Sequence, residues 1–489
     1  MKRTDRRTRL GQVFPLVMGL AWWATFTAQT AETAASYAVV VSSATQLDPE
    51  WRAVTWQLQK KHQATLVVYT NAVTEARPAL SRLMPRYTAF VARPEEAGRA
   101  FVVAIHRLTR QLDEDPYTDT QWGIVTGYSA RDALRIAAAT KPLEVRKGAG
   151  GTAIPLSVLE EGKWYDEGRK NHMVVKEKGG QPQDRPAPDD TTEELVETLN
   201  RYQPDFFMTS GHATERDWQI GYSYKNGQFR CRDGALFGVD TAGNTHPIHS
   251  PNPKIYFPAG NCLMGHIKDR QSMALAFMGS GGVNQMIGYT VSTWYGYGGW
   301  GVRDYFFDQP GRFTFAEAFY CNQLALVHEL ETRFPETARV DFPSYDIERN
   351  PRLLNEVAAR LKLRDPKTAK DNLGLLFDRD VVAFYGDPAW EARVPRQELA
   401  WEQSLREKTG TWTFELRARE TGSGARNTGQ HASSGRPPIE LFPVRLKNIK
   451  IIEGGDLKPV VADNFLLLGG LRQFEKGRVY RVVFTAEKF

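Results

Sequence analysis

Short apolar runs alternate with segments of helical periodicity in the first third of the chain. The runs YAVVVSS, ATLVVYT and WGIVTGY have the length and the β-branched content of buried strands, and the stretches between them space apolar residues three and four apart. This alternation is typical of βα units built on a mainly parallel sheet. We predict an N-terminal α/β subdomain over residues 36–145.

The alternation stops and then resumes. Residues 146–190 are rich in glycine, proline and scattered charges, which predicts an exposed insertion or linker. Within it, the loop Lys176–Asp190 is expected to lack regular structure and is a candidate processing site. Over residues 191–395 the runs KIYFPAG and GVNQMIGYT predict further strands, and Thr314 with Glu317 has the spacing of a capping box before a long helix. This region predicts a second α/β subdomain, again with helices flanking a mainly parallel sheet.

The last 94 residues have a different pattern. Segments such as TWTFELRAR and RVYRVVFTAEK alternate apolar and polar positions, and no helical period follows them. Such segments are typical of strands with one buried face. We therefore predict a small β-sandwich over residues 396–489.

The N-terminal segment has the pattern of an export signal. A basic start precedes the apolar run VFPLVMGLAWWATFTA and then the small and polar residues QTAETAAS, which predicts a secretory signal peptide over residues 1–35. Cleavage between Ala28 and Ser36 would leave no membrane span, since no other stretch is long and apolar enough. The alternative is an uncleaved anchor. We expect a secreted, periplasmic or cell-surface protein.

Composition narrows the classes of function. The chain of 489 residues is 41% apolar and 25% charged, which is ordinary for a globular protein. Four of its six net positive charges lie in the first ten residues, and no other basic cluster is interleaved with aromatic residues, so nucleic acid is not an expected partner. Three cysteines cannot form a disulfide framework, so a large core has to hold the fold.

Two of the predicted strands end in a reactive side chain. FFMTSGH ends at His212, and IYFPAGNC ends fifty residues later at Cys262. Because sites in open α/β sheets form at the carboxyl ends of strands, the two side chains are expected to meet in one crevice if the strands are neighbours. By contrast, Cys321 lies on a predicted helical face and is expected in the core, and Cys231 lies among polar turn residues and receives no role.

A cysteine and a histidine at such a place suit acyl transfer. A nearby imidazole stabilises the thiolate and later protonates a leaving amine. The backbone N–H groups of Cys262 and Ala213 are placed to hold the developing oxyanion. We predict that His212 and Cys262 are the catalytic residues.

Four motifs carry a resemblance to a known family. A strand-end histidine followed about fifty residues later by a strand-end cysteine resembles the caspase-like cysteine peptidases, and the segments GHATERDW, AGNCLMG, GVNQMIGYTVSTW and VVAFYGDPAW resemble the gingipain-type members. The resemblance covers about residues 37–390. It implies a caspase-like fold in two α/β subdomains, followed by an immunoglobulin-like domain.

The resemblance also implies a function. The chain is expected to be an exported cysteine endopeptidase that hydrolyses polypeptide substrates through a Cys262 thioester and needs no cofactor. Trp294 is a candidate wall of the substrate pocket, and Glu215 and Trp218, in the motif around the histidine, are further candidates for contacts with the substrate. The family usually has glycine after the histidine, whereas this chain has Ala213. That departure keeps open an alternative, an inactive peptidase-like module for surface binding or adhesion.

Metal sites receive weaker support from the sequence. Cys262 and His266 are four residues apart, but a zinc site needs further ligands, so we predict no metal at the catalytic residues. The acidic segment LDEDPYTDT offers oxygen ligands for a structural calcium ion, although it lacks a recognised loop pattern and also fits a solvated turn.

Overall fold

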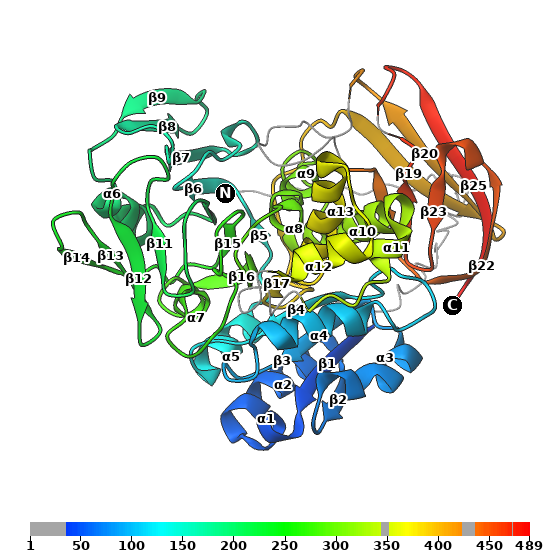
Figure 1. Cartoon of the computed structure of the whole chain (residues 1–489), viewed down its shortest axis with the longest axis horizontal. Coiled ribbons are helices and arrows are strands. Elements are labelled where there is room, and N and C mark those ends of the chain that lie inside the picture. Colours follow the sequence, from blue (N-terminus) through cyan, green and yellow to red (C-terminus); the bar gives the residue numbers. More distant parts are fainter. Residues whose placement is uncertain (1–35, 344–351, 423–435, 472) are drawn as a thin grey trace, which may run out of the picture. The chain divides into compact units, whose positions relative to one another are not determined.

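A twelve-stranded sheet runs through the α/β part of the chain (Figure 1). The computed structural model describes residues 36–343, 352–422, 436–471 and 473–489. Its strand order, β2-β1-β3-β4-β17-β16-β15-β10-β6-β7-β8-β9, joins both predicted α/β regions in one sheet. The bounds are β1 Tyr37–Ser42, β2 Thr65–Tyr69, β3 Tyr87–Val91, β4 Gln121–Val125, β17 Val382–Tyr385, β16 Val283–Tyr289, β15 Lys254–Pro258, β10 Phe206–Thr209, β6 Lys147–Gly150, β7 Glu161–Tyr165, β8 His172–Lys176 and β9 Gln183–Pro186.

Most of the sheet consists of two parallel halves that run in opposite directions, and β8 and β9 extend the second half in antiparallel fashion. Strands β1 to β4 and β17 are parallel to one another, as are β16, β15, β10, β6 and β7. The halves join where β16 pairs with β17 in antiparallel fashion. Consequently, the carboxyl ends of the two halves lie at opposite edges of the sheet. The prediction of a mainly parallel sheet is confirmed.

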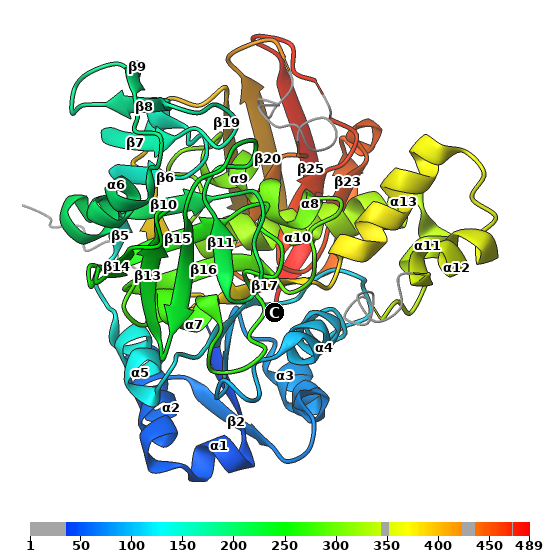
Figure 2. The same ribbon diagram turned by 60° about the vertical axis from the view of Figure 1, so that its left-hand side comes forward.

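Helices cover the sheet, as expected for strands that are buried on both faces. Helices α2 and α5 lie side by side on the first half (Figures 1 and 2), and the long helix α10 also contacts β4. The capping box predicted for α10 is confirmed, since Thr314 and Glu317 cap each other. The helices are α1 Ser43–Leu47, α2 Pro49–His62, α3 Arg77–Leu83, α4 Arg99–Thr109, α5 Ala130–Ala138, α6 Thr192–Glu197, α7 Met273–Met278, α8 Tyr297–Trp300, α9 Val302–Phe306, α10 Phe315–Arg333, α11 Pro335–Ala338, α12 Leu353–Arg360 and α13 Pro366–Asp378.

Residues 146–190 are not the insertion that their composition suggested. They contribute β6, β7, β8 and β9 to the main sheet, with β6 paired to β10. The glycines of β6 fit a crowded site: a Cβ on Gly148 would lie 2.4 Å from Leu159 Cδ1, and one on Gly150 would lie 2.8 Å from the Thr152 carbonyl oxygen. The loop Lys176–Asp190 was also expected to be irregular, whereas it includes β9, an exposed strand paired with β8.

Two smaller sheets complete the α/β part. Strands β11 Asp217–Gln219, β12 Gln228–Arg232, β13 Ala235–Val239 and β14 Thr245–Ile248 form an antiparallel sheet within the chain that connects β10 to β15. Strands β5 Leu143–Glu144 and β18 Ala392–Arg393 form a short parallel pair. The chain between β10 and β15 therefore folds into a small sheet of its own before it returns to the main sheet.

The C-terminal part forms two antiparallel sheets, as the alternating pattern predicted. One has the order β19-β20-β25-β22 and the other β21-β24-β23. Between them lies a separate apolar core with Trp412, Phe414 and Phe484. The bounds are β19 Trp401–Lys408, β20 Thr411–Ala418, β21 Ile439–Leu441, β22 Leu446–Glu453, β23 Pro459–Val461, β24 Phe465–Leu468 and β25 Val479–Lys488.

The predicted signal peptide, residues 1–35, lies outside the described residues. Among the helices of the described part, none has the length and the apolar content that a bilayer crossing requires.

Candidate functional site

The two strands that end near His212 and Cys262 are neighbours. Strands β10 and β15 lie side by side (Figure 2) and pair in parallel, and in this register Thr209 is opposite Pro258. All residues of both strands are buried. His212 follows the last residue of β10 by three positions, and Cys262 follows β15 by four, so the two residues leave the sheet at the same edge.

Asn261 ties the two strand ends together. Its side chain has no exposed surface. The amide nitrogen Nδ2 donates to the Gly211 carbonyl oxygen at 3.0 Å, and Oδ1 accepts a hydrogen bond from Thr209 Oγ1 at 2.6 Å. Both bonds cross from the cysteine strand to the histidine strand, so Asn261 fixes the backbone just before His212 relative to Cys262.

The chain turns sharply after the cysteine. Leu263 has φ of +59°, in the left-handed region that non-glycine residues rarely adopt. Its N–H donates to the Val291 carbonyl oxygen at 3.1 Å. The loop after β16 therefore stabilises a strained residue directly beside Cys262.

The same loop contacts the cysteine sulfur. The Thr293 N–H donates to Cys262 Sγ at 3.2 Å, and Thr293 Oγ1 donates to the Asn261 carbonyl oxygen at 3.2 Å. The Cys262 side chain is partly exposed. The loop after β16 therefore contacts the sulfur directly and leaves part of the Cys262 side chain open to solvent.

Two backbone donors at this edge have no partner. Among the described residues, the N–H groups of Ala213 and Cys262 donate no hydrogen bond. Ala213 forms a bridge with Trp218 and does not have a positive φ, whereas Gly211, two residues earlier, has φ of +85°. The conformation that needs glycine is thus at Gly211, and alanine at position 213 is not strained.

His212 is exposed and stacks on an aromatic ring. Its ring centroid lies 4.8 Å from that of Tyr222, and the ring planes differ by 28°. The Tyr222 N–H in turn donates to the Glu167 carbonyl oxygen at 2.6 Å. The stack restricts the orientation of the imidazole without covering it.

Glu167 is a neighbour that the sequence did not reveal. Its carboxylate accepts hydrogen bonds from the Ser210 and Thr152 hydroxyl groups, the latter at 2.7 Å. A Cβ on Gly211 would lie 3.2 Å from Glu167 Oε2. Glu167 follows β7, in the region that was taken for a linker, so no strand-end argument pointed to it.

The three predicted pocket residues have different positions. Trp294 is 43% exposed, on the loop that contacts Cys262. Trp218 is fully buried and donates from Nε1 to the Ser210 carbonyl oxygen at 2.9 Å, so it supports the histidine turn from inside and does not contact a substrate. The Glu215 carboxylate pairs with Lys268 at 2.6 Å. Burial alone would raise the pKa of Glu215, but the bond from Lys268 lowers it.

The other cysteines lie where the sequence placed them. Cys321 is fully buried on α10, and burial raises the pKa of its thiol well above the usual value. Cys231 is half-buried on β12, where burial raises the pKa of its thiol to about 11. Neither thiol is prepared for nucleophilic attack.

Among the described residues, no set of metal-ligating side chains gathers around Cys262 and His266. His266 is buried, and its Nδ1 lies 2.9 Å from the Arg99 guanidinium group. Within the part of the chain that the structure describes, the one group of metal-ligating side chains that lie close together is Asp113, Asp119 and Asp463, each with an oxygen within 4.8 Å of the others.

Part of the acidic segment LDEDPYTDT is therefore brought beside the β-sandwich. Burial, followed by repulsion from Asp113 and Asp115, raises the pKa of Asp119 to about 9. Arg445 pairs with Asp463 and partly offsets the negative charge. Three oxygens of this kind fit a calcium ion chemically, and a calcium ion remains a hypothesis for this cluster.

Residues 386–388, the Gly-Asp-Pro part of the motif VVAFYGDPAW, lie at the other edge of the sheet. Asp387 follows β17, which runs opposite to β15, and its buried carboxylate binds Lys61 at 2.8 Å and accepts a hydrogen bond from the Tyr37 hydroxyl at 2.8 Å. This segment holds the first half of the sheet together and does not contribute to the edge with Cys262.

Comparison with protein-family models, with curated proteins and with solved structures gave no match for this chain. The likeness to gingipain-type peptidases therefore rests on the four sequence motifs and stays a prediction.

Proposed function

We propose that the chain is a cysteine peptidase that cleaves peptide bonds with Cys262 as nucleophile and His212 as general acid and base. The observation that supports this proposal most is the pairing of β10 with β15, which puts both residues at one sheet edge, with Asn261 bridging the strand ends. A core cysteine and a surface histidine would not need such a bridge. The partly exposed sulfur and the exposed imidazole are also open to a substrate.

The reaction follows from the groups at this edge. The Cys262 thiolate attacks the peptide carbonyl, and the N–H groups of Cys262 and Ala213 hold the oxyanion. His212 protonates the leaving amine and then activates the water that hydrolyses the thioester. Glu167 and Tyr222 orient the histidine segment. Trp294, exposed and next in sequence to Thr293, whose N–H contacts the sulfur, is the residue that we expect to contact the substrate side chain.

The test is a peptide-library profile with the full chain, with Cys262→Ala and with Cys231→Ala. We expect wild type and Cys231→Ala to cleave the same peptides and Cys262→Ala to cleave none. The cysteine at 231 is a matched control, because burial keeps its thiol protonated. Cleavage by Cys262→Ala at the wild-type rate would refute the proposal.

Iodoacetamide labelling distinguishes a peptidase from the alternative, an inactive binding module. An activated Cys262 is expected to react within minutes near neutral pH, well before Cys231 or Cys321. Equal labelling of Cys262 and Cys231 would favour the inactive module. The support for that alternative came from Ala213, whose backbone angle is one that alanine adopts without strain.

Export and self-processing are further parts of the proposal. N-terminal sequencing of the secreted protein is expected to start between residues 28 and 36, and a start at Met1 would favour an anchor. The hairpin that contains β9 is exposed. Mass spectrometry of the incubated protein is expected to find new termini in Lys176–Asp190 for the wild type but not for Cys262→Ala, whereas equal cleavage of both would point to a contaminating protease.

A further inference from the structure

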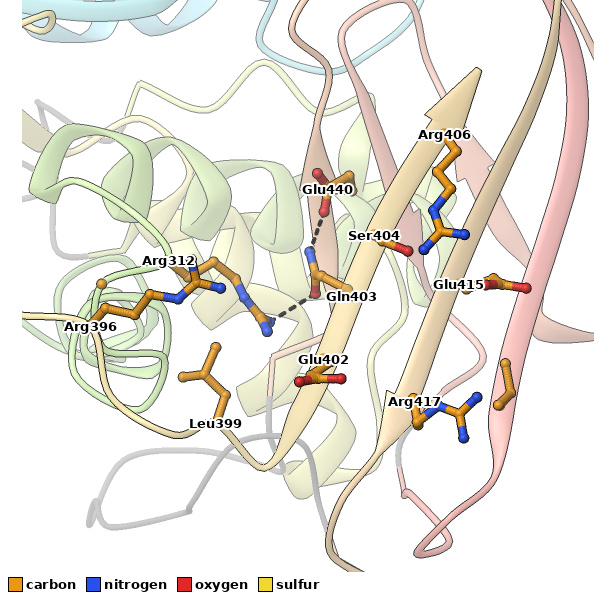
Figure 3. Close-up of a pocket in the computed structure, with 12 residues that line it drawn as sticks. Arg312, Arg396, Leu399, Glu402, Gln403, Ser404, Arg406, Glu415, Arg417 and Glu440 are labelled. Carbon is orange, nitrogen blue, oxygen red and sulfur yellow. Dashed lines mark hydrogen bonds between the residues drawn. The ribbon is translucent and has the colours of Figure 1, made fainter. Parts of the chain in front are cut away.

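A cavity lies between the α/β part and the β-sandwich, far in the sequence from Cys262. It has a volume of about 500 Å³, which is in the range of small-ligand sites. Two of its arginines, Arg312 and Arg396, come from segments before β19, and two others, Arg406 and Arg417, come from β19 and β20 (Figure 3). We call the first two the floor pair and the last two the strand pair.

The floor pair makes no ion pair within 4.0 Å among the described residues, although the carboxylate of Glu440, which lines the same cavity, lies near enough to act on Arg312. Arg312 donates to Gln309 Oε1, to Gln403 Oε1 and to the Trp401 carbonyl oxygen, which are all neutral acceptors. Burial lowers the pKa of Arg312 to about 10, Glu440 opposes that shift, and Arg396 adds to it. The two guanidinium groups are thus near enough to repel each other, and an anion between them would relieve the repulsion.

The strand pair likewise makes no ion pair within 4.0 Å among the described residues, although Glu402 stands opposite Arg417 in the strand register. Glu402 and Glu415, which line the same cavity, pair with arginines outside it, Glu402 with Arg419 and Glu415 with Arg481 at 3.8 Å.

The shape and chemistry of the walls favour an extended ligand. In Figure 3 the floor pair extends toward β19 from one side, while the strand pair lies along β19 and β20. The carboxylates of Glu402 and Glu415 stand on the strand wall, so a compact, highly charged anion such as phosphate would meet like charge. A peptide can space its carboxylates to reach both pairs and avoid these two groups.

The sheet edge adds a second feature that suits a peptide. Strand β19 is the first strand in its sheet and pairs only with β20 among the described strands. An extended peptide can add main-chain hydrogen bonds to such an edge. Bidentate contacts from arginine to carboxylate would then select acidic side chains.

We propose that this cavity binds an acidic peptide segment, with one carboxylate at the floor pair and another at the strand pair. The site is separate from Cys262, so the proposal holds whether or not the chain is a peptidase. In a peptidase it would be an exosite that selects acidic polypeptides.

The binding test uses a fluorescein-labelled hexapeptide of alternating glutamate and glycine, with the glutamine counterpart as control. The protein is the full chain with Cys262→Ala, so that the probe stays intact, and binding is followed by fluorescence anisotropy. We expect at least about tenfold tighter binding of the glutamate peptide, since a hydrogen bond to a charged group is worth about that factor. Raising the salt from about 50 to about 300 mM is expected to weaken the binding of the glutamate peptide.

Substitutions on each wall locate the site. Arg396→Gln and Arg406→Gln are each expected to weaken binding about tenfold, whereas Arg82→Gln, which removes the same charge from an exposed position on α3, is expected to leave it unchanged. Arg396 and Arg406 are both exposed, and neither has a hydrogen-bond partner among the described residues, so the fold is expected to tolerate the changes. Because the two lie on different walls, either one alone still tests the site if the other lowers the melting temperature.

Three results would overturn the proposal. Equal affinity for the two peptides would mean that carboxylates are not recognised. An equal loss with Arg82→Gln would mean that the attraction is only the net charge of the protein. Competition by inorganic phosphate at the concentration of the peptide itself would mean that the cavity is a simple oxyanion site and not a peptide site.

Discussion

The substitution Asn261→Asp tests whether the bridge between the strand ends organises the site. The change keeps the shape of the side chain and the acceptor for Thr209 Oγ1, but it replaces the donor to Gly211 with a second oxygen. Because the side chain has no exposed surface, the new carboxyl group has two options. It stays ionised against the Gly211 carbonyl oxygen, or it takes up a proton and donates it to that oxygen.

The second option, protonation of the new carboxyl group, sets an upper limit on the unfolding free energy that the variant loses. Protonating a carboxyl group with an ordinary pKa of about 3.9 costs about 1.4 kcal/mol for each pH unit above that value. The limit is therefore about 4 kcal/mol near pH 7 and about 1 kcal/mol near pH 4.5. The folded-state pKa is raised by burial, so stability is lost as the pH rises through the range above about 4.

The assay measures urea unfolding by tryptophan fluorescence at both pH values, with peptide hydrolysis in parallel. We expect Asn261→Asp to lose about 3–4 kcal/mol of unfolding free energy near pH 7 and to recover most of it near pH 4.5. Asn355→Asp is the matched control, since it makes the same change at an exposed position on α12. An equal loss at both pH values, or wild-type stability near pH 7, would refute the bridge.

Three other predictions follow from single groups. Burial raises the pKa of Asp119 to about 9, so the wild type loses stability as the pH rises from about 4 to 9. Asp119→Asn is therefore expected to stabilise the protein near pH 8 by about 2–5 kcal/mol in calcium-free buffer. A calcium-dependent loss of stability in the variant would instead support a bound ion. The hydrogen bonds that the His172 ring donates to Asp184 and Asp166 raise the pKa of His172. The protection of the β9 amides, which is hydrogen exchange corrected for its intrinsic acceleration with pH, is therefore expected to be high near pH 5.5 and to fall as the pH rises through that raised pKa, with no such fall in His172→Gln. Ala213→Gly is expected to leave peptide hydrolysis unchanged, since position 213 does not need a left-handed residue; a gain in rate would show that alanine is strained there.

The sequence could predict that His212 and Cys262 follow neighbouring strands, because short sequence patterns identify buried strands and parallel strands end on the same side of the sheet. Short apolar runs that end in turn residues are typical of buried strands, and the carboxyl ends of parallel neighbours lie at the same edge of the sheet. The sequence therefore predicted both β10 and β15 and the joint position of His212 and Cys262. It could not predict the reversal at β17, because strand direction depends on which strands pair.

Residues 146–190 were misread for a different reason. Strand β6 has the sequence KGAG and carries almost no apolar side chain, since the space above Gly148 is filled by Leu159 and Ile154. A strand whose role is to let others approach has the composition of a loop. The error also hid Glu167, which follows β7 at the same sheet edge as His212.

The residues that hold the candidate site together share a property that explains why the pattern missed them. Asn261, Thr293 and Glu167 each join segments that are far apart in the sequence, and each does so through one side chain or one backbone group. Periodicity reports which face of an element is buried, but it carries no information on single polar groups that bridge two elements. The positions of His212 and Cys262 at neighbouring strand ends are thus readable from the sequence, whereas the groups that align the two strand ends emerge only from the folded chain. For this reason the pH response of Asn261→Asp is a stronger test of the site than the loss of Cys262 alone, since it tests the alignment of the two strand ends and not only the presence of the thiol.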